Sequence, residues 1–103
     1  MKYLKKYEEN NRNYKKYLVL KDEDNKIYIR RYLYTINDNN SILRISSIAI
    51  YKIDEKGGRI LESKPFINLR KNFIDKLLIY QTDNLNEAIE FAEIEYNNNK
   101  YNL

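Results

Sequence analysis

Apolar and polar residues alternate along the stretch from Lys26 to Ile53, the longest β-branched and aromatic run of the chain. Alternation with a period of two predicts strands, and the polar segment 37–41 predicts a turn that joins two of them into one long hairpin. If Ile36 lies opposite Ile42, one face of the hairpin is aliphatic. A slip by one residue would turn Arg44 toward that face, so we expect the first register.

The end of the chain predicts an amphipathic helix. Asn84 can cap its first turn, and Glu87 follows three residues later, as in a capping box. Apolar residues recur at helical spacing behind this cap, and Ala88 and Ala92 are the small members of the stripe. Small residues allow close packing, so we expect the helix to lie on the aliphatic face of the hairpin. The small residues at the centre of that face are Ser47 and Ala49.

Shorter segments complete the predicted fold. Gly57 and Gly58 can supply the positive φ angles of a tight hairpin turn, and Pro65 ends the strand that follows. Segment 66–82 fits both a helical stripe and a buried strand, and we divide it between the two. The predicted elements are a strand at 14–21, a turn at 54–58, a strand at 59–64, a helical turn or loop at 66–75 and a strand at 76–81.

These elements predict a single domain of the α+β class that spans residues 1–103. We expect an antiparallel sheet of four or five strands with the C-terminal helix packed on one face. Segments 1–13 and 97–103 are polar and rich in Asn, so we expect flexible ends.

Composition argues against catalysis. The chain has no Cys and no His, which removes thiol chemistry and the commonest general base and metal ligand. Its two glycines are adjacent, so they do not form a phosphate-binding loop, and its acidic pairs fall in turns. We therefore expect no enzyme, no metal and no cofactor. Residues 1–6 do not resemble a signal peptide and no apolar run reaches the length of a membrane span, so we expect a cytoplasmic protein without a membrane partner.

Charge is distributed unevenly along the chain. Residues 1–82 carry a net charge of +8 and residues 83–103 a net charge of −4, so the predicted sheet is basic and the helix is acidic. A basic surface attracts polyanions and acidic protein surfaces alike. Asn, Lys, Ile and Tyr account for 53 of the 103 residues, and the codons of all four are AT-rich. This bias weakens arguments from the number of Tyr and Lys residues alone.

One constellation is a candidate binding site. Tyr28, Arg30, Tyr32 and Tyr34 fall on the second face of the hairpin, and Arg44 lies across from them. Exposed aromatic rings interleaved with Arg suit the stacking of bases and the binding of phosphates. Tyr and Arg are also frequent anchors of protein interfaces. A third interpretation is that these tyrosines are buried beneath the N-terminal segment or residues 66–75.

The functional prediction is a small non-catalytic binding protein. Size, composition and the AT-rich codons suggest a phage- or mobile-element-encoded protein that docks on a larger protein or ribonucleoprotein complex. Its most concrete form is an anti-CRISPR-type inhibitor of a host nucleic-acid-targeting machine. One alternative is an RNA- or single-stranded DNA-binding module that uses the basic, aromatic sheet face. Another is a structural protein that assembles, for example as a homodimer, through a sheet edge.

Overall fold

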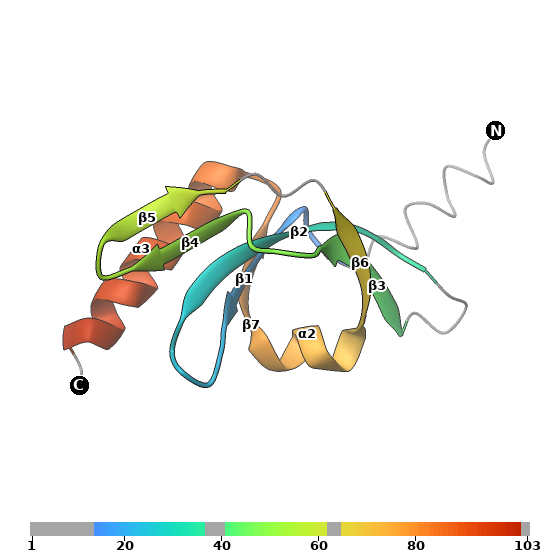
Figure 1. Ribbon diagram of the computed structural model, residues 1–103, viewed down its shortest axis with the longest axis horizontal. Coiled ribbons are helices and arrows are strands. Elements are labelled where there is room, and N and C mark those ends of the chain that lie inside the picture. The colour runs from blue at the N-terminus through green and yellow to red at the C-terminus, as the bar shows by residue number, and fades with distance from the viewer. Residues whose placement is uncertain (1–13, 37–40, 62–64, 102–103) are drawn as a thin grey trace.

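The computed structural model describes residues 14–36, 41–61 and 65–101, which form an antiparallel sheet of seven strands with two helices (Figure 1). The α+β class is confirmed, and the strand count exceeds the predicted four or five. In this part of the chain no helix is long and apolar enough to cross a membrane. The elements are β1 (Tyr17–Lys21), β2 (Ile27–Thr35), β3 (Ile42–Ser46), β4 (Tyr51–Asp54), β5 (Gly57–Ile60), β6 (Phe66–Arg70), α2 (Lys71–Leu77), β7 (Leu78–Thr82) and α3 (Leu85–Tyr101).

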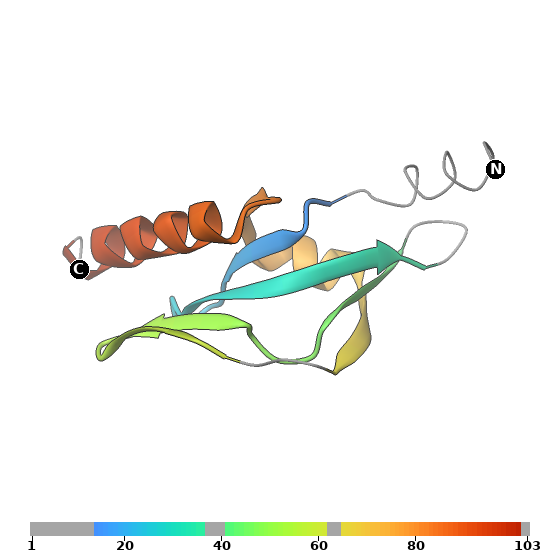
Figure 2. The ribbon, with the colours of Figure 1, turned by 90° about the horizontal axis from the view of Figure 1, so that it is seen from above.

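The long strand β2 organises the sheet. β1 pairs along one edge of β2, whereas β4 pairs with its first half and β3 with its second half. Figure 2 shows β3 and β4 on the same side of β2, with β1 on the other side. The sheet continues through β5 beyond β4, through β7 beyond β1 and through β6 beyond β3.

The predicted register of the central hairpin is confirmed next to its turn. The backbone N–H of Ile36 donates to the carbonyl of Ile42 at 2.8 Å, and Tyr34 lies opposite Arg44. The turn itself, residues 37–40, lies outside the described residues.

A bulge in β2 changes the register between Tyr34 and Tyr32, away from the turn. Tyr32 lies opposite Ile45, so Leu33 is the additional residue on β2. The register predicted from Ile36 and Ile42 places Leu33 opposite Ile45. Because an extra residue reverses the alternation of side chains, Thr35 turns into the core on the same side as Tyr32, and Tyr34 turns outward.

The chain then leaves β2 and returns to it. Residues 47–50 bend between β3 and β4. Ile29 pairs with Tyr51, whereas the register predicted from Ile36 and Ile42 places Ile29 opposite Ala49. β4 is thus shifted by two residues relative to the predicted register. Because side chains alternate with a period of two, Tyr51 lies on the same face as Ile29.

The sheet has a hydrophobic core on each side. In β1, Leu18 and Leu20 belong to one core, Val19 belongs to the other, and all three are fully buried. The α2 side chain Ile74 closes the first core, which β3 and β6 curl around. The alanines of α3 close the second core. β1 is therefore buried on both faces.

Capping fixes the start of α3. The backbone N–H of Glu87 donates to Asn84 Oδ1 at 3.1 Å, which confirms the predicted cap. The Glu87 carboxylate accepts a hydrogen bond from Thr82 Oγ1 at 2.7 Å, and the Asn84 N–H donates to the same hydroxyl at 3.1 Å. Thr82 thus links the end of β7 to the first turn of the helix.

The alanine stripe of α3 is the contact line, as predicted. Ala88 and Ala92 are fully buried, in the same core as Val19, Ile27 and Ile29. The expected complement at 47 and 49 is wrong, because that segment bends out of the sheet. The helix is continuous as far as residue 101. Segment 1–13 and residues 102–103, where we predicted flexible ends, lie outside the described residues.

Three shorter predictions need correction. Residues 66–70 form the strand β6 and not a helical turn or loop, because β3 provides a pairing edge and Ile67 and Leu69 alternate into the first core. The helix α2 and strand β7 follow directly, so the predicted strand at 76–81 begins two residues later. The predicted strand at 59–64 overlaps β5, which ends at Ile60. Residues 62–64 lie outside the described part of the chain.

The turn between β4 and β5 explains both glycines. Gly57 has a φ of +108°, so the predicted positive φ angle is confirmed there. Gly58 has no positive φ, but a Cβ at this position would lie 1.7 Å from the Tyr51 hydroxyl. The Tyr51 ring therefore leaves no room for a side chain at position 58.

Candidate binding surfaces

The five predicted site residues do not form one exposed face. Tyr32 is only 2% exposed, its hydroxyl lies 2.7 Å from Thr35 Oγ1, and its ring centroid lies 5.3 Å from that of Tyr14. Tyr32 is thus a core residue, which agrees with the interpretation that this side of the sheet is covered. Because the bulge at Leu33 reverses the alternation, Tyr28 and Tyr34 lie on opposite sides of the sheet.

Arg30 binds backbone carbonyls at the point where the chain leaves β3 and bends away from β2. Its guanidinium donates to the carbonyls of Ser46 and Ser47 at 2.9 and 3.0 Å. The Ser46 hydroxyl accepts from the backbone N–H of Arg31 at 3.0 Å. These side-chain hydrogen bonds replace backbone hydrogen bonds between β2 and the chain that are lost at the bend. We therefore assign Arg30 a structural role.

Two of the five residues remain in an exposed cluster. Tyr34 is 46% exposed and lies opposite Arg44, which in turn lies opposite Asn68 on β6. The Arg44 guanidinium donates to Asn68 Oδ1 at 2.9 Å. Residues paired across strands share a face, so this row points outward together with the exposed Arg70, two residues along β6.

Arg31 completes this cluster. It is exposed. Arg31 and Tyr34 are three residues apart and would lie on opposite sides of a regular strand, but the extra residue in the bulge between them places both on the same side of β2. We call the set of Arg31, Tyr34, Arg44, Asn68 and Arg70 the arginine face. β3 and β6, which carry Arg44, Asn68 and Arg70, lie at the end of the molecule remote from α3 (Figures 1 and 2).

The choice of cation on these strands is selective. β2, β3 and β6 together carry four arginines and no Lys, Asp or Glu. The whole chain has 13 Lys and only 6 Arg. The codon bias that enriches Lys therefore does not explain arginine here. Within the described residues, none of these four arginines forms an ion pair with a carboxylate.

A second basic surface lies on β4, β5 and the start of β2. Tyr28 lies opposite Lys52, and Lys52 lies opposite Arg59 on β5. This row faces away from α3, because the alternate residues Tyr51 and Ile53 pack toward that helix. We call the set of Lys26, Tyr28, Lys52, Lys56 and Arg59 the hairpin face.

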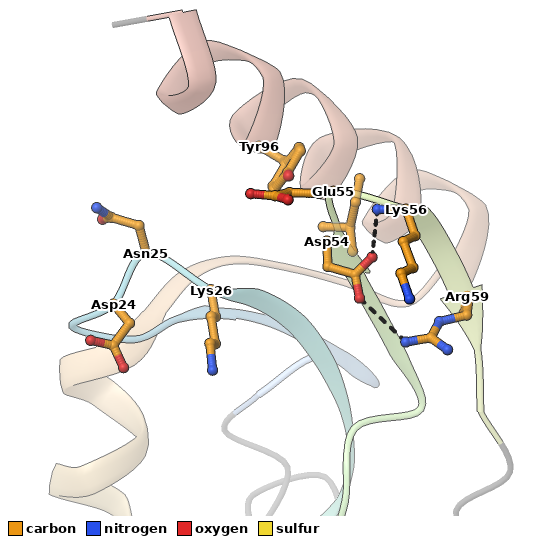
Figure 3. Close-up of a pocket in the computed structure, with 9 residues that line it drawn as sticks. Asp24, Asn25, Lys26, Asp54, Glu55, Lys56, Arg59 and Tyr96 are labelled. Atoms are coloured by element: carbon orange, nitrogen blue, oxygen red, sulfur yellow. Dashed lines mark hydrogen bonds and ion pairs between the residues drawn. The ribbon is translucent and has the colours of Figure 1, made fainter. Parts of the chain in front are cut away.

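The turn side of the hairpin face borders a hollow of about 430 Å³ between the β1–β2 turn, the β4–β5 turn and Tyr96 of α3. Figure 3 shows the cationic ends of Lys26, Lys56 and Arg59 on one side of it, away from Tyr96. Asp54 contacts Arg59 at 3.3 Å. The N–H of Lys56, together with the charges of Arg59 and Lys52, lowers the pKa of Asp54.

A cluster of polar side chains joins residue 14 to α2. The Tyr14 hydroxyl donates to Asp75, and Lys71 Nζ lies 2.6 Å from the same carboxylate. Burial, reinforced by Asp75, raises the pKa of Tyr14 to about 12. Burial alone would raise the pKa of Asp75, but the hydrogen bonds from Lys71 and Tyr14 lower it. At neutral pH the phenol is protonated and the carboxylate is charged, which fastens the start of β1 to the helix.

In the described ranges, no group of three or more acidic side chains is arranged to hold a metal ion. Sequence reasoning missed Asn68 and Arg70 because the pairing of β3 with β6 brings them to the side of Tyr34. It missed Arg31 because only the bulge at Leu33 places that residue on the same side of β2 as Tyr34. It also missed Lys52 and Arg59, which a regular hairpin at Gly57 would have placed opposite each other. The concentration of Arg in an otherwise Lys-rich chain was the available signal for the arginine face.

Comparisons with protein-family models, with curated proteins and with solved structures found no match to this chain.

Proposed function

We propose that this chain is a non-catalytic binding protein that docks on an acidic surface of a larger protein or ribonucleoprotein assembly through the arginine face. The observation that carries the proposal is the composition of this face. It combines two exposed arginines and one partly exposed arginine with a half-exposed tyrosine and an asparagine, without Lys or acidic residues on its three strands.

This composition is typical of protein interfaces. Tyr and Arg are enriched there because they provide large contact areas and several hydrogen bonds, whereas Lys, Asp and Glu are depleted. The planar guanidinium of Arg binds carboxylates in a bidentate manner. Asn68 holds Arg44 in place at 2.9 Å, so the guanidinium loses less freedom on binding. An acidic partner would also be drawn to this face by long-range attraction.

Association kinetics provide the test. The tagged protein is used to capture partners from a host lysate, and each captured protein is then purified and titrated. Arg44→Glu combined with Arg70→Glu should weaken binding at least a hundredfold, because two attractive contacts become repulsive. Tyr34→Ala should slow association little and speed dissociation.

The matched control is Lys52→Glu with Arg59→Glu, which makes the same change in net charge on the hairpin face. A partner whose affinity falls equally with both double variants responds to net charge and does not dock on the arginine face. A partner insensitive to Arg44, Arg70 and Tyr34 refutes the proposal, whatever its affinity.

The narrower form of the proposal is an anti-CRISPR-type inhibitor of a nucleic-acid-targeting complex. It is supported by the small size and the composition of the chain. The purified protein should then lower target cleavage by such a complex in a dose-dependent manner. The double variant at Arg44 and Arg70 should restore cleavage, and inhibition that persists in this variant would refute the narrower form.

A further inference from the structure

The hairpin face contains an unfavourable pair of like charges. Lys52 and Arg59 lie directly opposite each other on β4 and β5, an arrangement that destabilises a two-stranded ladder. Asp54 contacts the guanidinium of Arg59 at 3.3 Å, so one carboxylate is shared among the neighbouring cations. A positive charge therefore remains on this row.

Two further lysines strengthen this charge. The ends of Lys26 and Lys56 turn to the same side of the sheet as Arg59 (Figure 3), and both lysines are exposed. Tyr28 lies beside Lys52, and the guanidinium of Arg30 lies 5.7 Å from the centre of its ring. The surface therefore combines one partly exposed aromatic ring with a row of cations.

We propose that the hairpin face binds the phosphate backbone of single-stranded nucleic acid, with one base stacked on Tyr28. Phosphates would lie along Lys26, Lys52 and Arg59 and relieve the repulsion between the last two. This site is separate from the arginine face, because β4 and β5 lie at the end of the molecule near α3 (Figures 1 and 2).

The chemistry of the face favours a nucleic acid over a protein. Lysine is depleted from protein interfaces, yet three of the four cations here are Lys. Point charges on flexible stems suit a phosphate backbone without sequence preference, and an aromatic ring accepts any base. A single strand exposes its bases for stacking, whereas a duplex does not.

The experiment is a fluorescence-anisotropy titration of the full chain with an oligothymidylate of about twelve nucleotides, within the usual size of single-strand sites. Contacts with three phosphates predict that the logarithm of affinity falls with the logarithm of salt with a slope of about −2. Lys52→Glu should lower affinity at least tenfold and flatten this slope. It should not lower the melting temperature, because Glu opposite Arg59 is a favourable pair.

Tyr28→Leu tests the stacked base. Leu keeps apolar contact with the core that Tyr28 adjoins, but it removes the aromatic surface. Affinity for the oligonucleotide should fall at least about fivefold, the lower range for one stacked base. Affinity for inorganic polyphosphate of similar charge should not change, and polyphosphate should bind more weakly than the oligonucleotide.

Lys15→Glu is the matched control, since it makes the same change in net charge at an exposed site before β1. An equal loss with Lys15→Glu and Lys52→Glu would show a response to net charge and overturn the proposal. Equal affinity for polyphosphate and the oligonucleotide would overturn the assignment to nucleic acid. Absence of binding at low salt and about 100 μM protein, weaker than ordinary non-specific binding, would overturn the site itself.

Discussion

Replacing Tyr32 with Ala is the most direct test of the bulge in β2. The side chain is only 2% exposed, packs beside the Tyr14 ring and places its hydroxyl 2.7 Å from Thr35 Oγ1. Truncating a buried aromatic residue typically costs about 3–5 kcal/mol. A domain of this size unfolds with a free energy of roughly 5–15 kcal/mol, so the variant loses a large part of its stability.

The expected change in melting temperature follows from the size of the chain. The unfolding entropy of about 2.1 cal/mol/K per residue corresponds to about 0.2 kcal/mol/K for 103 residues. A loss of about 3–5 kcal/mol therefore lowers the melting temperature by roughly 14–23 °C. Thermal and urea unfolding followed by circular dichroism measure this change.

Tyr34→Ala is the matched control, because Tyr34 lies two residues further along β2 and is 46% exposed. We expect a change within about 0.5 kcal/mol, as for most surface substitutions. In a regular strand Tyr32 and Tyr34 would share one face, and the two variants would lose similar stability. Equal losses, or a larger loss for Tyr34→Ala, would refute the bulge at Leu33 and with it the arrangement of the arginine face.

Three other perturbations test separate parts of the fold. Ala92→Leu should overpack the contact between α3 and the sheet and cost about 1–3 kcal/mol, and an unchanged urea midpoint would mean that the helix docks through another side. Lys52→Glu should raise stability by about 0.2–1 kcal/mol in low salt, and this gain should shrink in 1 M NaCl. Burial raises the pKa of both Tyr14 and Tyr51 to about 12, from 10.0. The stability that these two protonated phenols contribute to the fold is therefore fully present below pH 10 and is lost as the pH rises from 10 to 12. A urea midpoint that stays constant to pH 12 would contradict this prediction.

Local sequence signals predicted the elements whose determinants are close together in the chain. The cap at Asn84, the stripe through Ala88 and Ala92, the positive φ angle of Gly57 and the hairpin register beside Ile36 all follow from neighbouring residues. Each of these features depends on backbone geometry over a few residues, and tertiary context did not override it.

The features that sequence reasoning missed depend on distant partners. β6 is a strand because β3 offers it an edge, and Phe66 and Leu69 fit a helical stripe equally well. The bulge at Leu33 has no sequence signature, since it contains neither Gly nor Pro. One extra residue in β2 was enough to separate Tyr28 from Tyr34, so a candidate site inferred from strict alternation was divided between two surfaces.

The position of β1 between β2 and β7 has a consequence for the synthesis of this protein. Val19 and Leu20 are fully buried in the finished fold, yet one edge of their strand pairs only with β7, which ends at Thr82. A ribosome that adds about 5–20 residues per second needs roughly 3–12 s to pass from Lys21 to Thr82. During that interval the nascent chain exposes an apolar strand with one unpaired edge, and such surfaces are prone to aggregation.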